Sequence, residues 1–232
     1  MSPRARSIVI VLPLLLVLGA CNGGDESRDV SDVDAAQVLE AAAVRLEEAE
    51  SFHVKIEHEN GSTQIISGLA MTEAEGDYAG TDRVQLDILA RVLGTNISSG
   101  IVILPDGEYF KNPINGRWVE QDLDIAQIFD PSSGVTALMR DATNPRAVSA
   151  ERVNGIEAYL IEAQVDSGDL VRFVANAQPG MTVDARVWVG IDDSRVYRAE
   201  ITGPVAPDDA DDIVRRIELS AYDEPVDITA PE

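Results

Sequence analysis

The single cysteine of this chain, Cys21, ends an N-terminal apolar run and limits how the folded chain can be held together. Arg4 and Arg6 precede twelve mostly apolar residues, Ser7–Leu18, and two small residues stand directly before the cysteine. A positive segment, a short apolar stretch and small residues together form a secretory signal. The ending Leu-Gly-Ala-Cys matches the bacterial lipobox. We therefore expect residues 1–20 to be a signal peptide and Cys21 to be acylated.

A lone cysteine in this position has two consequences. Without a second thiol, neither an intrachain disulfide nor a thiolate metal cluster can form, so stability must come from packing. Twelve apolar residues are too few to span a bilayer as a helix, so attachment depends on acyl chains, and two chains hold firmly where one does not. We expect a lipid-anchored protein on the extracytoplasmic face of the cell membrane. The alternative is a secreted protein with an unpaired thiol near its cleavage site.

Length and charge narrow the choice further. About 200 of the 232 residues follow Cys21, which is enough for one domain with a sizeable core. Residues 21–31 are short and polar, as expected of a lipidated N-terminus and tether, and we assign residues 32–232 to a single domain. The exported chain keeps 16 of its 18 basic residues against 41 acidic ones, a net charge of −25. Such a surface repels phosphate backbones and anionic lipid head groups, which excludes nucleic acid as a partner.

Apolar spacing divides the domain into helices and strands. Residues 32–50 carry apolar side chains at helical spacing and predict an amphipathic helix with Ser31 or Asp32 as its N-cap. From Ser51 onward, apolar residues recur at every second position, which predicts a strand. Asn60-Gly61 then predicts a hairpin whose returning strand covers residues 63–72. Alternation and turn residues predict further strands over residues 84–92, 98–104, 108–111, 117–119, 148–153, 156–165, 183–191, 195–203 and 213–222.

These strands describe an antiparallel meander with one apolar face, interrupted in its middle by a helix. The helical spacing starts at Ile125, and Pro131-Ser132-Ser133 offers a new helix start that continues to about residue 142. Residues 170–178 fit either a loop or a short helix. We expect an α+β fold of about ten strands, with helices at the start and in the middle.

Residues that could carry chemistry are few. His53 and His58 lie five positions apart on one predicted strand, so their side chains point to opposite faces and cannot chelate one ion; we expect both to be exposed. The four aspartates of residues 208–212 lack the spaced ligands of an EF-hand loop and favour a charged loop. No nucleophile, phosphate-loop or zinc-protease motif occurs. We therefore expect no catalytic residue, no metal, no cofactor and no enzymatic activity.

The apolar residues leave open what fills the interior. The one-sided sheet and the mid-chain helix must bury their apolar faces against each other. Aromatic residues make up only 5% of the chain, so these faces consist mostly of Val, Ile, Leu and Ala. A wide sheet filled by small aliphatic side chains could leave a dry gap suited to acyl chains. Composition alone favours the alternative, an ordinary filled core.

Several segments, taken in order and spacing, match a known pattern. They are the lipobox followed by a helix and Ser51-Phe52-His53-Val54, the Trp118 strand leading to Phe129-Asp130-Pro131-Ser132-Ser133-Gly134-Val135, then Val153-Asn154-Gly155-Ile156, Ala185-Arg186-Val187-Trp188-Val189, and Leu219-Ser220-Ala221-Tyr222-Asp223-Glu224-Pro225-Val226. With them the chain resembles the actinobacterial LppX/LprG (LppX–LprAFG) family of lipoproteins over most of its exported length. The resemblance implies a strongly curved antiparallel half-barrel with helices on its concave face around a large apolar cavity for lipid tails.

The resemblance also implies a carrier, because members of this family bind acylated glycolipids or triglyceride-like lipids and move them toward the cell surface, in places with a neighbouring membrane transporter. We expect a monomeric, membrane-anchored lipoprotein that binds the acyl chains of a lipid or glycolipid in an apolar cavity and carries it across the cell envelope. The alternative is a non-catalytic cell-envelope interaction or scaffold protein with a filled core. By their positions, the residues expected to line the cavity are Val84, Leu86, Ile88, Ile101, Ile103, Ile128, Phe129, Val135, Leu138, Met139, Val187 and Val189.

Overall fold

The fold is described from a computed structural model for residues 28–66, 69–80, 82–121, 135–171, 173–174 and 176–231. Two helices and twelve strands occur in this part of the chain. The helices are α1 (Ala35–Glu47) and α2 (Val135–Asp141). The strands are β1 (Ser51–Glu59), β2 (Thr63–Ile66), β3 (Leu69–Ala79), β4 (Arg83–Val92), β5 (Thr95–Leu104), β6 (Gly107–Lys111), β7 (Trp118–Glu120), β8 (Thr143–Val153), β9 (Ile156–Asp166), β10 (Thr182–Gly190), β11 (Val196–Thr202) and β12 (Val214–Ser220).

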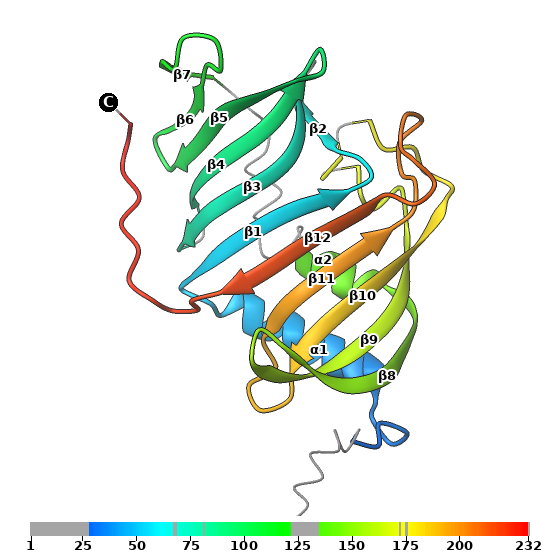
Figure 1. Ribbon diagram of the computed structural model, residues 1–232. Helices are drawn as coiled ribbons and strands as arrows, with labels where there is room; N and C mark the ends of the chain where they lie inside the picture. Colours follow the sequence, from blue (N-terminus) through cyan, green and yellow to red (C-terminus); the bar gives the residue numbers. More distant parts are fainter. Residues whose placement is uncertain are drawn as a thin grey trace, which may run out of the picture.

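All these strands join one antiparallel, curved and unclosed sheet with the order β7-β6-β5-β4-β3-β1-β12-β11-β10-β9-β8, and β2 pairs with β3 beside this path. The first and last strands of the domain, β1 and β12, are neighbours in the middle of the sheet, where His53 lies opposite Ser220. Both helices lie behind the same face of the sheet in Figure 1, on the side of β8–β12. The expected antiparallel meander with helices on one face is confirmed.

The strand count exceeds the expected ten, in part because the segment after Asn60-Gly61 does not form one returning strand. It divides into β2 and β3, and β3 rather than β2 lies beside β1. The type I′ turn that Asn-Gly favours needs a positive φ at both central residues, but of these two only Asn60 has one (φ 59). Gly61 instead allows a close approach, because a Cβ on it would lie 2.3 Å from Cδ1 of Ile213.

The last five strands begin and end close to their predicted bounds, except that β8 starts at Thr143 rather than at residue 148. Pro145 has no N–H to donate, yet β8 tolerates it because β8 is an edge strand and the register shifts between Thr143 and Arg146. The described residues of 170–178 form turns, with the Val174 N–H donating to the Leu170 carbonyl at 2.9 Å.

The first helix is confirmed, but it starts three residues later than predicted. Asp34, rather than Ser31 or Asp32, is the N-cap, and its carboxylate accepts the N–H of Gln37 at 3.1 Å. The mid-chain helix is confirmed over α2, whereas residues 122–134 lie outside the described part of the chain. Arg140 on α2 pairs with Glu40 (3.1 Å) and Glu47 (2.5 Å) on α1, and its hydrogen bond lowers the pKa of Glu47. These ion pairs connect the two helices at the surface.

Candidate functional site

The face of the sheet that is turned toward the helices, here called the inner face, is apolar, whereas the outer face is polar. Along β4, Val84, Leu86, Ile88 and Ala90 are buried, and most residues between them are exposed. The buried residues of β4 form one cluster with Leu39 and other small apolar residues of α1. The inner face is therefore the surface that could contact an apolar ligand.

The predicted lining residues mostly meet on this inner face. One buried cluster contains Val84, Leu86, Ile88, Ile101, Ile103, Met139, Val187 and Val189, and Val135 packs against it while partly buried. Leu138 packs instead against a second cluster around Leu170 and Val205, and Ile128 and Phe129 lie outside the described residues. That the cluster residues contact lipid stays a prediction.

The inner face also includes residues that were not predicted to line a cavity. Phe52 and Val54 of β1 belong to the same cluster, and their alternation with polar residues was a signal that could have placed them there. On β3 the signal was hidden, because Met71 and Ala74 both face inward although their numbers differ in parity. A register shift between Met71 and Glu73 causes this change, and such a bulge interrupts the alternation by which a strand face is recognised.

The side chains of the inner face are not equally buried by the elements that pack on it. Ile161 and Val189, on strands beside the helices, are almost completely buried. By contrast, Ile56 and Ile217, which lie directly opposite each other on β1 and β12, are only partly buried. Other partly buried apolar side chains on this cluster are Ile65, Val92, Ile97 and Phe110. Aliphatic side chains that remain partly accessible on the inner face can contact hydrocarbon without any rearrangement of the sheet.

A buried polar cluster interrupts the inner face where β1 meets β12. Nη2 of Arg215 donates to both carboxylate oxygens of Asp209 at 2.9 and 2.8 Å, and each of these two side chains is less than a tenth exposed. The Asp209 carboxylate also accepts the N–H groups of Val205 and Ala206. Asp209, one of the aspartates predicted to form a charged loop, is thus a buried structural residue.

His58 belongs to this polar cluster, and the expectation that it is exposed was wrong. Its Nδ1 lies 3.0 Å from the Thr72 carbonyl and must donate to it, so Nε2 accepts from the Thr63 hydroxyl at 2.7 Å. Nε of Arg215 donates to the same hydroxyl oxygen at 3.1 Å. Burial, together with the nearby Arg215 charge, lowers the pKa of His58, because a second positive charge here would be poorly solvated.

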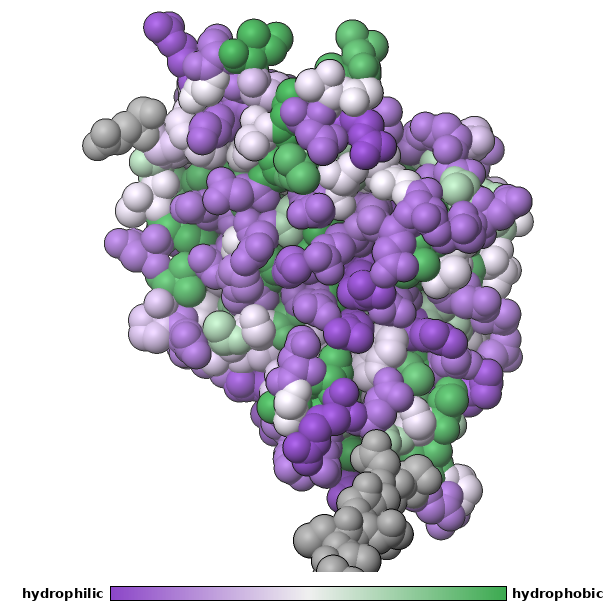
Figure 2. Space-filling model, viewed as in Figure 1, coloured by the Kyte–Doolittle hydropathy of each residue, from purple (hydrophilic) through white to green (hydrophobic). Residues whose placement is uncertain are grey.

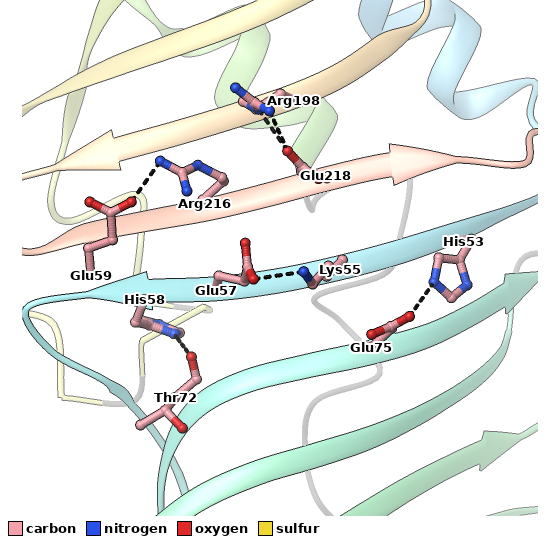
Figure 3. Close-up of polar contacts among 10 residues, drawn as sticks. All are labelled: His53, Lys55, Glu57, His58, Glu59, Thr72, Glu75, Arg198, Arg216 and Glu218. Atoms are coloured by element: carbon pink, nitrogen blue, oxygen red, sulfur yellow. Dashed lines mark hydrogen bonds and ion pairs between the residues drawn. The ribbon is translucent and has the colours of Figure 1, made fainter. Parts of the chain in front are cut away.

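The outer face carries ion pairs that cross from strand to strand (Figure 3). Arg198 pairs with Glu218 at 2.6 Å across β11 and β12, and Arg216 pairs with Glu59 at 2.8 Å across β12 and β1. His53 lies 3.3 Å from Glu75 on the neighbouring strand β3. Hydrophilic side chains cover most of this face in Figure 2. The outer face is suited to water rather than to an apolar ligand.

Two further observations concern the described residues alone. No three of their His, Cys, Asp or Glu side chains are grouped so that they could hold a metal ion. Neither α1 nor α2 is long and apolar enough to cross a bilayer.

Comparison with known sequences points to lipoproteins. A family model described as LppX_LprAFG lipoprotein matches residues 34–228. The lipoarabinomannan carrier protein LprG of Mycolicibacterium smegmatis is 22% identical over 205 residues, covering 83% of this chain and 83% of that protein. The protein of the same name from Mycolicibacterium hassiacum is 22% identical over 240 residues, covering 100% of this chain and 99% of that protein.

Solved structures show a similar fold. LprF from Mycobacterium bovis superimposes with a TM-score of 0.66 at 18% identity, covering 85% of this chain and 96% of that one. The Mycobacterium tuberculosis lipoprotein LppX gives a TM-score of 0.62 at 17% identity, covering 86% of this chain and 100% of that one. At these identities the likeness shows a shared fold and does not transfer a ligand.

Proposed function

The chain belongs to the LppX_LprAFG lipoprotein family, and we propose that it is a lipid carrier anchored to the cell membrane through Cys21. It binds the acyl chains of a lipid or glycolipid in a cavity between the inner face and the helices, and it carries that lipid across the cell envelope. The observation that carries this proposal is the uneven cover of the inner face, where aliphatic side chains such as Ile56 and Ile217 are only partly buried. The relatives named as lipoarabinomannan carriers support a glycolipid as the cargo.

The physics of transfer requires no reaction. Each methylene taken into water costs about 0.8 kcal/mol, so a chain of about sixteen carbons meets a barrier of about 12 kcal/mol when it leaves a bilayer unaided. A protein surface lined by aliphatic side chains removes most of this barrier. Specificity then depends on the volume and shape of the space, because aliphatic side chains do not select a head group by hydrogen bonding.

Mass spectrometry of bound lipid tests the proposal directly. Residues 21–232 carrying Cys21→Ser, which cannot be acylated, are purified from a bacterial envelope, and the organic extract is analysed for acyl lipids. Uptake of a fluorescent fatty acid is then titrated. A carrier yields a defined lipid in the extract and binds the probe. The absence of both would overturn the proposal and favour an envelope interaction or scaffold protein with a filled core.

A pair of neighbouring substitutions locates the binding face. Ile56→Trp adds bulk to the inner face, and Lys55→Trp adds the same bulk to the outer face one residue away. If the indole displaces about two methylenes of the probe, Ile56→Trp weakens uptake by about tenfold, whereas Lys55→Trp leaves it unchanged. Thermal unfolding of both variants shows whether they fold. Equal uptake by two folded variants would exclude the inner face as the site.

A further inference from the structure

Two exposed aliphatic residues stand at adjacent turns of the sheet. Leu93, in the β4–β5 turn, is 101% exposed, and Ile114, in the β6–β7 turn, is 93% exposed, while the other exposed large hydrophobic residues of the described chain reach at most 45%. Both turns lie at the upper end of the sheet in Figure 1, and hydrophobic groups protrude at this edge in Figure 2. We call residues 89–99 and 109–118, which form these two turns and their flanks, the hairpin tips.

The stability of the fold does not explain why a leucine occupies position 93. Leu93-Gly94 is a two-residue turn with φ values of 49 and 81, and Asn154-Gly155 forms the same turn between β8 and β9 with φ values of 51 and 85. Asparagine tolerates a positive φ, whereas a leucine there is strained. The chain thus keeps, at one of two equivalent turns, a residue that strains the backbone and contacts water. Because Leu93 is fully exposed, no packing within the chain offsets this strain.

Charge at the hairpin tips is opposite to that of the whole molecule. Residues 89–99 and 109–118 contain Arg91, Lys111 and Arg117 but no aspartate or glutamate, although the chain has 41 acidic residues. With the described residues, Arg91 and Arg117 form no ion pair or side-chain hydrogen bond, whereas other arginines such as Arg198 and Arg216 are paired. Unpaired guanidinium groups can bind anionic head groups, and protruding aliphatic side chains beside them can enter an apolar layer. Such a combination suits a surface whose outer layer is anionic and whose interior is apolar.

We propose that the hairpin tips dock on the surface of a lipid bilayer. Leu93 and Ile114 enter the boundary of the acyl region, and Arg91 and Arg117 contact anionic head groups. The proposal goes beyond lipid carriage and does not depend on it. It also refines the inference from net charge, because the local charge of the hairpin tips is positive and opposes the repulsion expected of a −25 protein at this end.

A bilayer fits the tips better than a protein partner does. A stable protein interface buries about 800 Å² on each side in a well-packed patch, whereas the tips offer two separate protruding side chains. A second copy docked tip to tip would bring like charges together.

The tips also connect to the inner face. Val92 and Ile97 flank the β4–β5 turn, and Ile65 lies on β2, which pairs with the nearby start of β3. All three are partly buried apolar residues that pack against the inner-face cluster. Under the proposed carrier function, an acyl chain that leaves a docked bilayer would meet this apolar path first.

Vesicle binding tests the proposal. Residues 21–232 with Cys21→Ser are mixed with vesicles of phosphatidylcholine alone or with added phosphatidylglycerol, and the bound fraction is measured by flotation. We expect binding that increases with phosphatidylglycerol. Leu93→Asn combined with Ile114→Asn lowers the partition coefficient on both vesicles, by about tenfold for each side chain withdrawn from the membrane. Arg91→Gln combined with Arg117→Gln removes mainly the phosphatidylglycerol dependence, by about fivefold for each charge.

The controls keep the outcome clear. Ile156→Asn changes an exposed aliphatic residue beside the β8–β9 turn and leaves vesicle binding unchanged. Leu93→Asn is compatible with the positive φ of the turn, so the variant folds, and thermal unfolding verifies this. Equal vesicle binding by wild type and the Leu93/Ile114 variant, or no binding by the wild type, would overturn the proposal. Loss of a dimer in the variant without vesicle binding by the wild type would identify a second copy as the partner instead.

Discussion

The two ends of the sheet follow the same alternating pattern but are covered differently. On the side of β8–β11, here called the covered half, α1 contacts β8 and β10, and Ile161 is completely buried. On the side of β2–β7, the distal half, the inner-face residues of β4 are buried as far as Ala90, whereas Val92 at the end of the strand is partly buried and Leu93 just after it is fully exposed. The comparison shows that alternation makes a face apolar, whereas the elements packed on that face decide whether it is closed.

The turns differ in the same direction. The covered half uses residues that favour turns, with Asn154 before a glycine and Asp193 accepting the N–H of Arg195 at 3.0 Å. The distal half places the exposed Leu93 and Ile114 at its turns, although Asn112 and Asn115 also accept backbone N–H groups in the turn that carries Ile114. The difference therefore lies in the leucine that takes the positive φ at position 93 and in the apolar side chains that the distal turns expose.

The largest effect is expected from core truncations that compare the two halves. Ile161→Ala, in the covered half, should lower the free energy of unfolding by about 3 to 4 kcal/mol, because the side chain is completely enclosed. Ile97→Ala, at a partly buried position of the distal half, should cost about 1 kcal/mol. Urea denaturation measures both. An equal loss would mean that the two halves are packed alike and would weaken the case for accessible space.

The inner and outer faces of the sheet can be compared at β12, which lies between the two halves and carries an ion pair on each face. Asp209→Asn leaves the guanidinium of Arg215 buried without its carboxylate and should cost about 3 kcal/mol. Glu218→Gln removes the partner of Arg198 on the outer face, where water screens the pair, and should cost less than about 1 kcal/mol. Chemical denaturation again gives both values. A larger loss from Glu218→Gln would contradict the assignment of the two faces.

Acidification should destabilise the protein through His58. Its pKa in the folded protein is below the ordinary value of 6.5, so below that pH the unfolded chain takes up a proton that the folded chain does not. The free energy of unfolding then falls with pH by at most about 1.4 kcal/mol per pH unit, until His58 is protonated in the folded state.

A histidine variant isolates this effect in pH-dependent denaturation. His58→Gln should flatten the stability profile below the ordinary histidine pKa, because it removes the group that the folded chain keeps unprotonated. An unchanged slope in this variant would show that the burial of His58 is not its cause.

The smallest effect is expected from exchanging the residues of the two equivalent turns. Leu93→Asn should raise the free energy of unfolding by about 1 kcal/mol, because asparagine tolerates the positive φ. Asn154→Leu should lower it by a similar amount at the same position of the other turn. Thermal denaturation detects both shifts. A loss of stability in Leu93→Asn would show that Leu93 supports the fold, and that it is not kept for an external contact.

The local pattern predicted more of the fold than of the site. Residues 84–92 were recognised as a strand, and Val84, Leu86 and Ile88 as its apolar face. This was possible because apolar and polar residues alternate there from one position to the next, and such alternation is visible in the sequence alone. The same reasoning missed Met71 and Ala74, since a bulge shifts the parity between them. It also joined β2 and β3 into one strand, because the close approach of Ile213 to Gly61 involves residues far apart in the chain.

The amino-acid sequence by itself determined most of the segments that form strands and helices and which side of the sheet is apolar, and it predicts an export signal ending in Cys21. Only the tertiary structure decided that Asp209 and Arg215 form a buried pair, that the helices cover one half of the inner face, and that the turns carrying Leu93 and Ile114 lie at the same end. The physical reason is distance along the chain. Propensity and alternation act between near neighbours, whereas pairing, cover and exposure depend on residues that only folding brings together.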